Sequence, residues 1–170
     1  MTDNPFNPPS AEVEDPLEKT QPYGSLWKGV IIGGVIDLGG STALGFVFVI
    51  LYAVLNIDSI SSLPDILNLL EQLVEESVSF TSVWGLTGII LGSIISLVAG
   101  YVCALFAREF WIKAALILGA IDALYVMANG QGFYSMETNL GFGLLTFILV
   151  FIGGWLRVLQ KGKKIELESN

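Results

Sequence analysis

Residues 28–55 read KGVIIGGVIDLGGSTALGFVFVILYAVL, and this stretch decides the fold class. After Lys28 at its start, its one charged residue is Asp37. A helix needs about 20 apolar residues to cross a hydrocarbon core of about 30 Å, so the stretch is long enough to do so. Residues 83–107, 110–128 and 140–156 have the same character. We therefore predict an all-α integral membrane protein in which residues 25–158 form a bundle of four transmembrane helices.

The overall composition favours a membrane protein over a soluble helical bundle. Of the 170 residues, 53% are hydrophobic and 14% are charged, whereas about 25% are charged in soluble domains. The helices of a soluble bundle need polar outer faces at the 3.6-residue period, but these stretches are apolar all round. The lipid bilayer is therefore the predicted partner. The net charge of −8 disfavours nucleic acid as a partner.

Basic residues are confined to three segments of the chain, which predicts the orientation. They precede the first apolar stretch, separate the second from the third, and follow the fourth: Lys19, Lys28, Arg108, Lys113, Arg157, Lys161, Lys163 and Lys164. The other two connections carry acidic residues and no Lys or Arg. Basic residues stay on the cytoplasmic side of a membrane. Both termini are therefore predicted to be cytoplasmic, with residues 159–170 as a basic and then acidic tail.

The N-terminal residues 1–24 are rich in Pro, Asn and acidic side chains, which predicts a disordered cytoplasmic tail. Within it, residues 4–13 read NPFNPPSAEV. This stretch resembles the leader NP(Y/F)xPPxAxV of many uncharacterised proteobacterial inner-membrane proteins, with Phe6 where Tyr is commoner. The resemblance covers little more than the leader and implies a bacterial inner-membrane location. A eukaryotic interpretation, in which Asn4-Pro5-Phe6 is a ligand for endocytic adaptor domains, is the weaker alternative.

The first external connection contains a predicted short amphipathic helix at residues 63–77. Ser62 and Asp65 have the spacing of a capping box, and Pro64 lies in the first turn. Apolar residues then recur at helical spacing between acidic ones. The helix lacks a basic face, so we expect it to pack on the protein rather than on anionic lipid. The alternative is an acidic vestibule that concentrates cations.

A short phrase occurs twice, as Gly34-Val35-Ile36-Asp37 in the first stretch and Gly119-Ala120-Ile121-Asp122 in the third. An aspartate inside a membrane span is costly, so its presence needs a reason. The repeat suggests two similar helical hairpins in parallel orientation. At 1.5 Å per residue, both aspartates should lie roughly 13–17 Å from the cytoplasmic end of their helices.

Small residues recur every fourth position on the first two stretches. The first carries Gly29, Gly33, Asp37, Ser41 and Gly45, and the second carries Gly88, Gly92, Ser96, Gly100 and Ala104. Such faces let helix backbones approach closely. We therefore predict that the two stripes pack together and bury Asp37. The stripe around Asp122 is less regular, and the fourth stretch is expected to be the most lipid-facing.

The aspartates are the candidate functional residues, because no Lys, Arg or His lies at their depth. They could be kept neutral by a proton, since burial disfavours the charged form. They could accept hydrogen bonds from neighbouring hydroxyls, of which the candidates are Ser41, Thr42, Thr87, Ser93, Ser96 and Tyr125. They could also hold a proton or cation that moves.

Two functions remain open on the sequence. The first is an accessory or structural membrane protein, whose aspartates are hydrogen-bonding sites for helix packing within the bundle, in a homo-oligomer or against another membrane protein. The alternative is a proton- or cation-coupled transporter, or a subunit of one, that uses Asp37 and Asp122. We expect no enzyme, cofactor or metal site, because the sequence contains no catalytic motif and no metal-ligand cluster.

Overall fold

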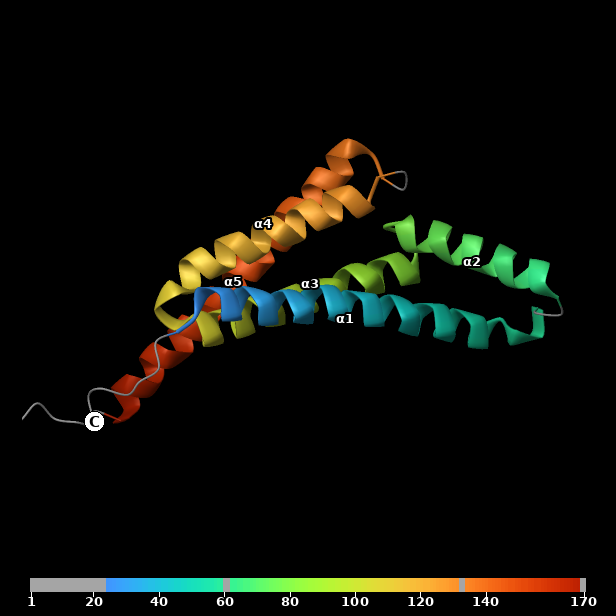
Figure 1. The fold of residues 1–170 in the computed structure, drawn as a ribbon. Coiled ribbons are helices and arrows are strands. Elements are labelled where there is room, and N and C mark those ends of the chain that lie inside the picture. The colour runs from blue at the N-terminus through green and yellow to red at the C-terminus, as the bar shows by residue number, and fades with distance from the viewer. Residues whose placement is uncertain (1–23, 60–61, 132–133, 169–170) are drawn as a thin grey trace, which may run out of the picture.

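The computed structural model describes residues 24–59, 62–131 and 134–168, and they form helices without a sheet (Figure 1). The predicted N-terminal tail, apart from Gly24, and its leader lie outside the described residues. In chain order the elements are α1 (Leu26–Leu55), η1 (Ile57–Ser59), α2 (Leu63–Val78), α3 (Val83–Ala107), η2 (Arg108–Phe110), α4 (Trp111–Asn129) and α5 (Met136–Glu168).

Three segments among the described residues are long and apolar enough to cross a membrane: Leu26–Leu55, Val83–Asn129 and Met136–Lys161. The middle segment has 47 residues and contains both α3 and α4. The chain reverses direction between them at η2 (Figure 1), where Arg108 has a φ of 51°. The described chain therefore contains four long apolar helices, of which α3 and α4 run back along each other.

Helix α3 lies between α1 and α5, while α4 packs along α5 and also touches α1 and α3. The expectation that the fourth apolar stretch is the most lipid-facing is wrong. In the apolar window of α1 only 6% of the residues are buried, against 22% for α5. The physical reason is a pair of glycines on α5. A side chain at Gly153 would collide with the Leu97 carbonyl, and Gly154 lies against Trp111 of α4.

The end of the bundle that contains η2 is tightly packed. The Ser25 backbone N–H donates a 3.1 Å hydrogen bond to the carbonyl of Phe106. A Cβ at Gly29 would lie 2.6 Å from the Cys103 carbonyl oxygen. At the opposite end, the α4–α5 pair leans away from the α1–α3 pair (Figure 1). Close packing at one end and divergence at the other open a space between the two pairs.

Helix α2 lies at this open end and runs back from the end of α1 to the start of α3 (Figure 1). It occupies the range in which the sequence predicts an amphipathic helix. The Ser62 backbone N–H and hydroxyl both donate to the Asp65 carboxylate at 2.8 Å, which stabilises the first turn. The Tyr52 hydroxyl of α1 donates to Glu76 of α2 at 3.3 Å. This bond, together with the packing of α2 on α1 and α3, attaches α2 to the protein.

Helix α5 is longer than the predicted fourth span at residues 140–156. It begins at Met136 and continues to Glu168, through the basic segment predicted as a separate tail. Lys, Gln, Arg and Glu have high helix propensity, so this polar segment continues the helix beyond the apolar span.

Candidate functional site

Asp37 and Asp122 are both buried in the middle of the bundle. Asp37 on α1 is 4% exposed, and Asp122 on α4 is 1% exposed. The Ser96 hydroxyl on α3 donates a 2.9 Å hydrogen bond to Oδ1 of Asp37. Ser96 is itself buried, and it lies on the small-residue face that the sequence predicts for this helix. The bond therefore joins α1 to α3 inside the apolar interior.

Asp122 lies against Asp37, within range of both a hydrogen bond and a charge interaction between the two carboxyl groups. Both oxygens of Asp122 are buried and, among the described residues, no donor reaches them when both acids are ionised. Two carboxylates have no proton to share, so a hydrogen bond between them needs one of the acids to be protonated. The site thus contains two acids and one protein donor, which Asp37 uses.

Basic side chains are absent from the depth of this acid pair. The sequence contains no Lys, Arg or His between residues 29 and 107 or between residues 114 and 156. Two ionised carboxylates this close repel each other strongly in a medium of low dielectric. A proton or a monovalent cation would remove the repulsion. The pair is therefore chemically suited to hold one of these.

The wall around the pair is apolar and tightly packed. Ala99, Cys103 and Leu118 are fully buried. A Cβ at Gly33 would lie 2.6 Å from Cδ2 of Leu118 and 2.9 Å from Cβ of Cys103. Cys103 also lies near Asp122. In the part of the chain that the structure describes, no group of three or more His, Cys, Asp or Glu side chains could hold a metal ion.

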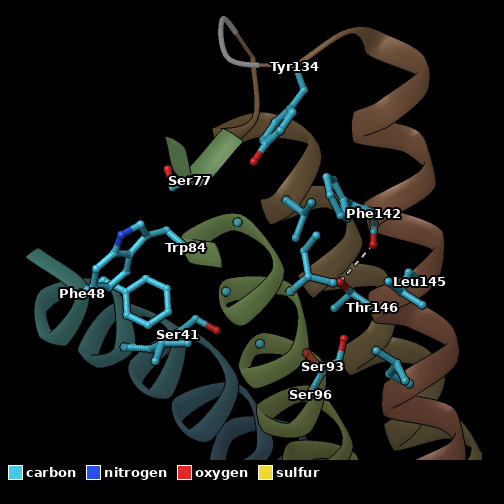
Figure 2. Close-up of a pocket in the computed structure, with 18 residues that line it drawn as sticks. Ser41, Phe48, Ser77, Trp84, Ser93, Ser96, Tyr134, Phe142, Leu145 and Thr146 are labelled. Carbon is cyan, nitrogen blue, oxygen red and sulfur yellow. Dashed lines mark hydrogen bonds between the residues drawn. The ribbon is translucent and has the colours of Figure 1, made fainter. Parts of the chain in front are cut away.

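A cavity of about 380 Å³ lies between the two helix pairs at the α2 end of the bundle (Figure 2). Hydroxyl groups of Ser41, Ser93, Ser96 and Thr146 line it, together with aromatic rings nearer to α2. Ser96 belongs to both features, because it lines the cavity and donates to Asp37. The cavity is therefore connected to the acid pair through a single hydroxyl group.

Of the other hydroxyls predicted near the aspartates, several lie elsewhere. Ser41 lines the cavity but is exposed, and Thr42 is exposed and donates to the Leu38 carbonyl at 2.7 Å. Tyr125 is 45% exposed although it follows Asp122 by less than one turn. Thr42 and Tyr125 point away because successive helical residues are rotated by about 100°.

The two small-residue stripes, which the sequence predicts to pack together around Asp37, do so over the first part of α1 and separate beyond it. Gly29 and Gly33 do contact α3, but a side chain at Gly100 would meet the Val150 backbone of α5. A Cβ at Gly45 or Gly92 would meet nothing within 4 Å. At Gly88 the nearest atom belongs to the Phe48 ring, at 3.5 Å. The stripes separate because α3 is shared between α1 and α5, and the separation leaves the cavity.

Sequence reasoning missed the cavity residues of α5. Phe142, Leu145, Thr146 and Leu149 line the cavity, and their spacing of three and four residues places them on one helix face. That periodicity could have been recognised, but in an all-apolar helix it does not stand out. Tyr134, in the connection between α4 and α5, also lines the cavity.

No protein-family model, curated protein or solved structure matches this chain. Function is therefore inferred from the geometry of the acid pair and of the cavity.

Proposed function

We propose that α1, α3, α4 and α5 each cross a bacterial inner membrane and that both termini are cytoplasmic. Basic residues support this orientation. Lys28 lies over the Phe106 ring at 5.4 Å, and Arg157 lies over the Tyr101 ring at 5.9 Å. Both contacts, like Arg108 in η2, are at the end of the bundle opposite to the acidic helix α2. Because basic residues remain cytoplasmic, the η2 end is assigned to the cytoplasm.

The Asp37–Asp122 pair is proposed to handle a proton or a monovalent cation in a small transporter or a transporter subunit. The observation that carries this proposal is the burial of Asp122 against Asp37, with no donor among the described residues for either of its oxygens. A carboxyl group that serves only to pack helices is expected to face a donor. Asp122 faces another acid instead, and a proton or cation between them satisfies both.

The accessory or structural function remains the second candidate, and the bond from Ser96 to Asp37 favours it. An interhelical hydrogen bond of this kind contributes about 0.6–1.7 kcal/mol in a membrane. This role explains why Asp37 is buried, but it gives no reason for burying Asp122 beside it. The two candidates therefore differ in whether the pair carries an exchangeable proton.

The matched positions of the two aspartates also support the proposed pair of similar hairpins. In that arrangement α1–α3 is one hairpin and α4–α5 is the other, so the repeated Gly-x-Ile-Asp phrase places one acid in each half. Parallel repeats of this kind place their sites at the interface between the halves.

Infrared spectroscopy of the purified protein in lipid tests the proposal. A buried protonated carboxyl has a C=O stretch that shifts when its proton exchanges for deuterium. We expect such a band in the wild type and its loss in the Asp37→Asn/Asp122→Asn variant. Asp58→Asn is the matched control, because Asp58 is exposed in η1 and lies outside the site.

Proton flux into liposomes is the second measurement. With a membrane potential imposed, the wild type and Asp58→Asn should acidify the interior faster than empty liposomes, and the double variant should not. A wild type without the exchangeable band and without flux would leave the structural function as the explanation.

A further inference from the structure

Two hydroxyl groups that line the cavity, those of Ser96 and Thr146, present hydrogen-bond acceptors to its interior. The Ser96 hydroxyl uses its proton on Asp37, and the Thr146 hydroxyl donates to the Phe142 carbonyl at 3.0 Å. A hydroxyl whose proton is engaged still has lone pairs to offer. A ligand that donates a hydrogen bond or carries a positive charge therefore suits these two hydroxyl groups.

Aromatic rings surround the part of the cavity nearer to α2 (Figure 2). Phe48 and Trp84 meet edge to face, with ring centroids 5.4 Å apart, and Tyr134 and Phe142 do the same at 5.4 Å. Aromatic faces attract cations and also pack against apolar groups. None of the described residues that line the cavity is charged. The walls therefore suit an apolar body that carries a delocalised or shielded charge.

Glycines provide the space for such a ligand. Gly45, Gly88 and Gly92 line the cavity, and a Cβ at Gly45 or Gly92 would meet no atom within 4 Å. The resulting volume of about 380 Å³ is within the range of about 300–1,000 Å³ in which proteins bind small molecules.

We propose that this cavity binds a monovalent organic cation with an apolar body, such as a protonated or quaternary amine, and that the Asp37–Asp122 pair behind Ser96 is its counter-charge. The inference rests on the proposed function in one respect, because the pair must be able to exchange a proton. When the two acids share one proton, they retain one negative charge in an apolar interior. Either a second proton or the bound cation neutralises that charge.

Proton and ligand are therefore expected to compete, so the affinity for the cation should fall as the pH falls. The titratable groups at the pair come from three helices: Asp37 from α1, Cys103 from α3 and Asp122 from α4. Helix α5 contributes none, because its sequence contains no titratable residue between Glu137 and Arg157. The pH dependence of cation binding is therefore assigned to the two carboxyl groups of the pair.

Equilibrium dialysis of the full-length protein in nanodiscs of zwitterionic lipid tests the inference. The probe is benzyltrimethylammonium, and neopentylbenzene is its neutral counterpart of the same shape. We expect saturable binding of the cation, a clear preference over the neutral compound, and weaker binding at lower pH. Affinity should fall by at least about tenfold, or 1.4 kcal/mol, in the Asp37→Asn/Asp122→Asn variant.

Gly92→Leu is the second decisive variant, because Gly92 lines the cavity and an added Cβ there meets no atom within 4 Å. Gly141→Leu is the matched control: Gly141 is also free of atoms within 4 Å, but it does not line the cavity. Binding should be lost in Gly92→Leu and kept in Gly141→Leu. If Gly92→Leu does not fold, Gly45→Leu fills the same cavity from α1.

Equal binding of the neutral compound, binding that survives cavity filling, or no saturable binding of the cation would each overturn the inference. The infrared carboxyl band separates this failure from failure of the proposed function. A wild type that has an exchangeable band but binds no cation contradicts the inference alone. A wild type without the band contradicts the proposed function as well.

Discussion

Ser96 on α3 and Asp37 on α1 form a 2.9 Å hydrogen bond that connects the cavity at the α2 end of the bundle to the buried acid pair. The bond provides Asp37 with a hydrogen-bond donor. Asp122 has no such donor among the described residues and lies beside the Asp37 carboxyl group instead. The Ser96 hydroxyl therefore both joins α1 to α3 and lies between the cavity and the acid pair. This relationship determines which substitutions separate the structural role of the site from its proposed role in ion handling.

Ser96→Ala should weaken the association of α1 with α3. The variant removes the donor to Asp37 and leaves a buried acceptor, which should lower the free energy of unfolding by about 0.6–2 kcal/mol. Thermal unfolding in detergent measures the change. Ser93→Ala is the matched control, because Ser93 lines the same cavity one turn earlier, whereas Ser96 makes the bond to Asp37. Equal stability of the two variants would contradict a structural role for the bond.

Gly33→Ala should destabilise the bundle by about 1–3 kcal/mol, because the new methyl group overpacks the interior. Its Cβ would lie 2.6 Å from Leu118 and 2.9 Å from Cys103, both of which belong to the apolar wall around the acid pair. Gly39→Ala on the same helix is the control, since a Cβ there meets nothing within 4 Å. Its stability should be unchanged or slightly higher. Denaturant titration of both variants provides the comparison.

Cysteine labelling should distinguish four membrane crossings from three. In a Cys103→Ala background, a cysteine at Asp58 should react with a membrane-impermeant maleimide in intact spheroplasts. A cysteine at Lys161 should react only after lysis, because both termini are proposed to be cytoplasmic. Both positions are exposed. If the segment Val83–Asn129 crossed the membrane once, Lys161 would lie on the same side as Asp58 and would be labelled without lysis.

Stability should fall at alkaline pH through Tyr134. Burial raises the pKa of the Tyr134 phenol above 10.0 in the folded protein. The unfolded chain therefore releases this proton first, so the stabilising contribution is complete below pH 10 and is lost as the pH rises through the folded pKa. Melting temperatures measured from pH 9 upward should decline in the wild type and decline less in Tyr134→Phe. Identical curves would mean that Tyr134 remains exposed to solvent.

The structure confirms the helical membrane class that the apolar stretches predict, and it buries Asp37 at a hydrogen bond to Ser96. These features follow from local pattern. Length and apolar composition identify a span, and residues four positions apart share a helix face. The sequence therefore predicts a close helix contact at Gly29 and Gly33, and in the structure both glycines lie against α3.

The neighbours of each helix could not be predicted in the same way. Both α4 and α5 are apolar all round, so periodicity does not indicate which side faces protein and which faces lipid. The packing of α5 against α3 depends on close backbone approaches between distant residues, such as Gly153 to Leu97 and Gly100 to Val150.

The amino-acid sequence by itself determined that this chain is an apolar helical protein. It also determined that the first and third apolar stretches each contain one repeated aspartate, with the basic residues placed away from both. That follows because hydrocarbon length and charge placement are properties of short segments. Only the tertiary structure decided that the carboxyl groups of Asp37 and Asp122 lie close enough to interact and that Ser96 lines a cavity beside them. The reason is physical: the rotation and tilt of each helix are set by contacts with helices far away in the sequence.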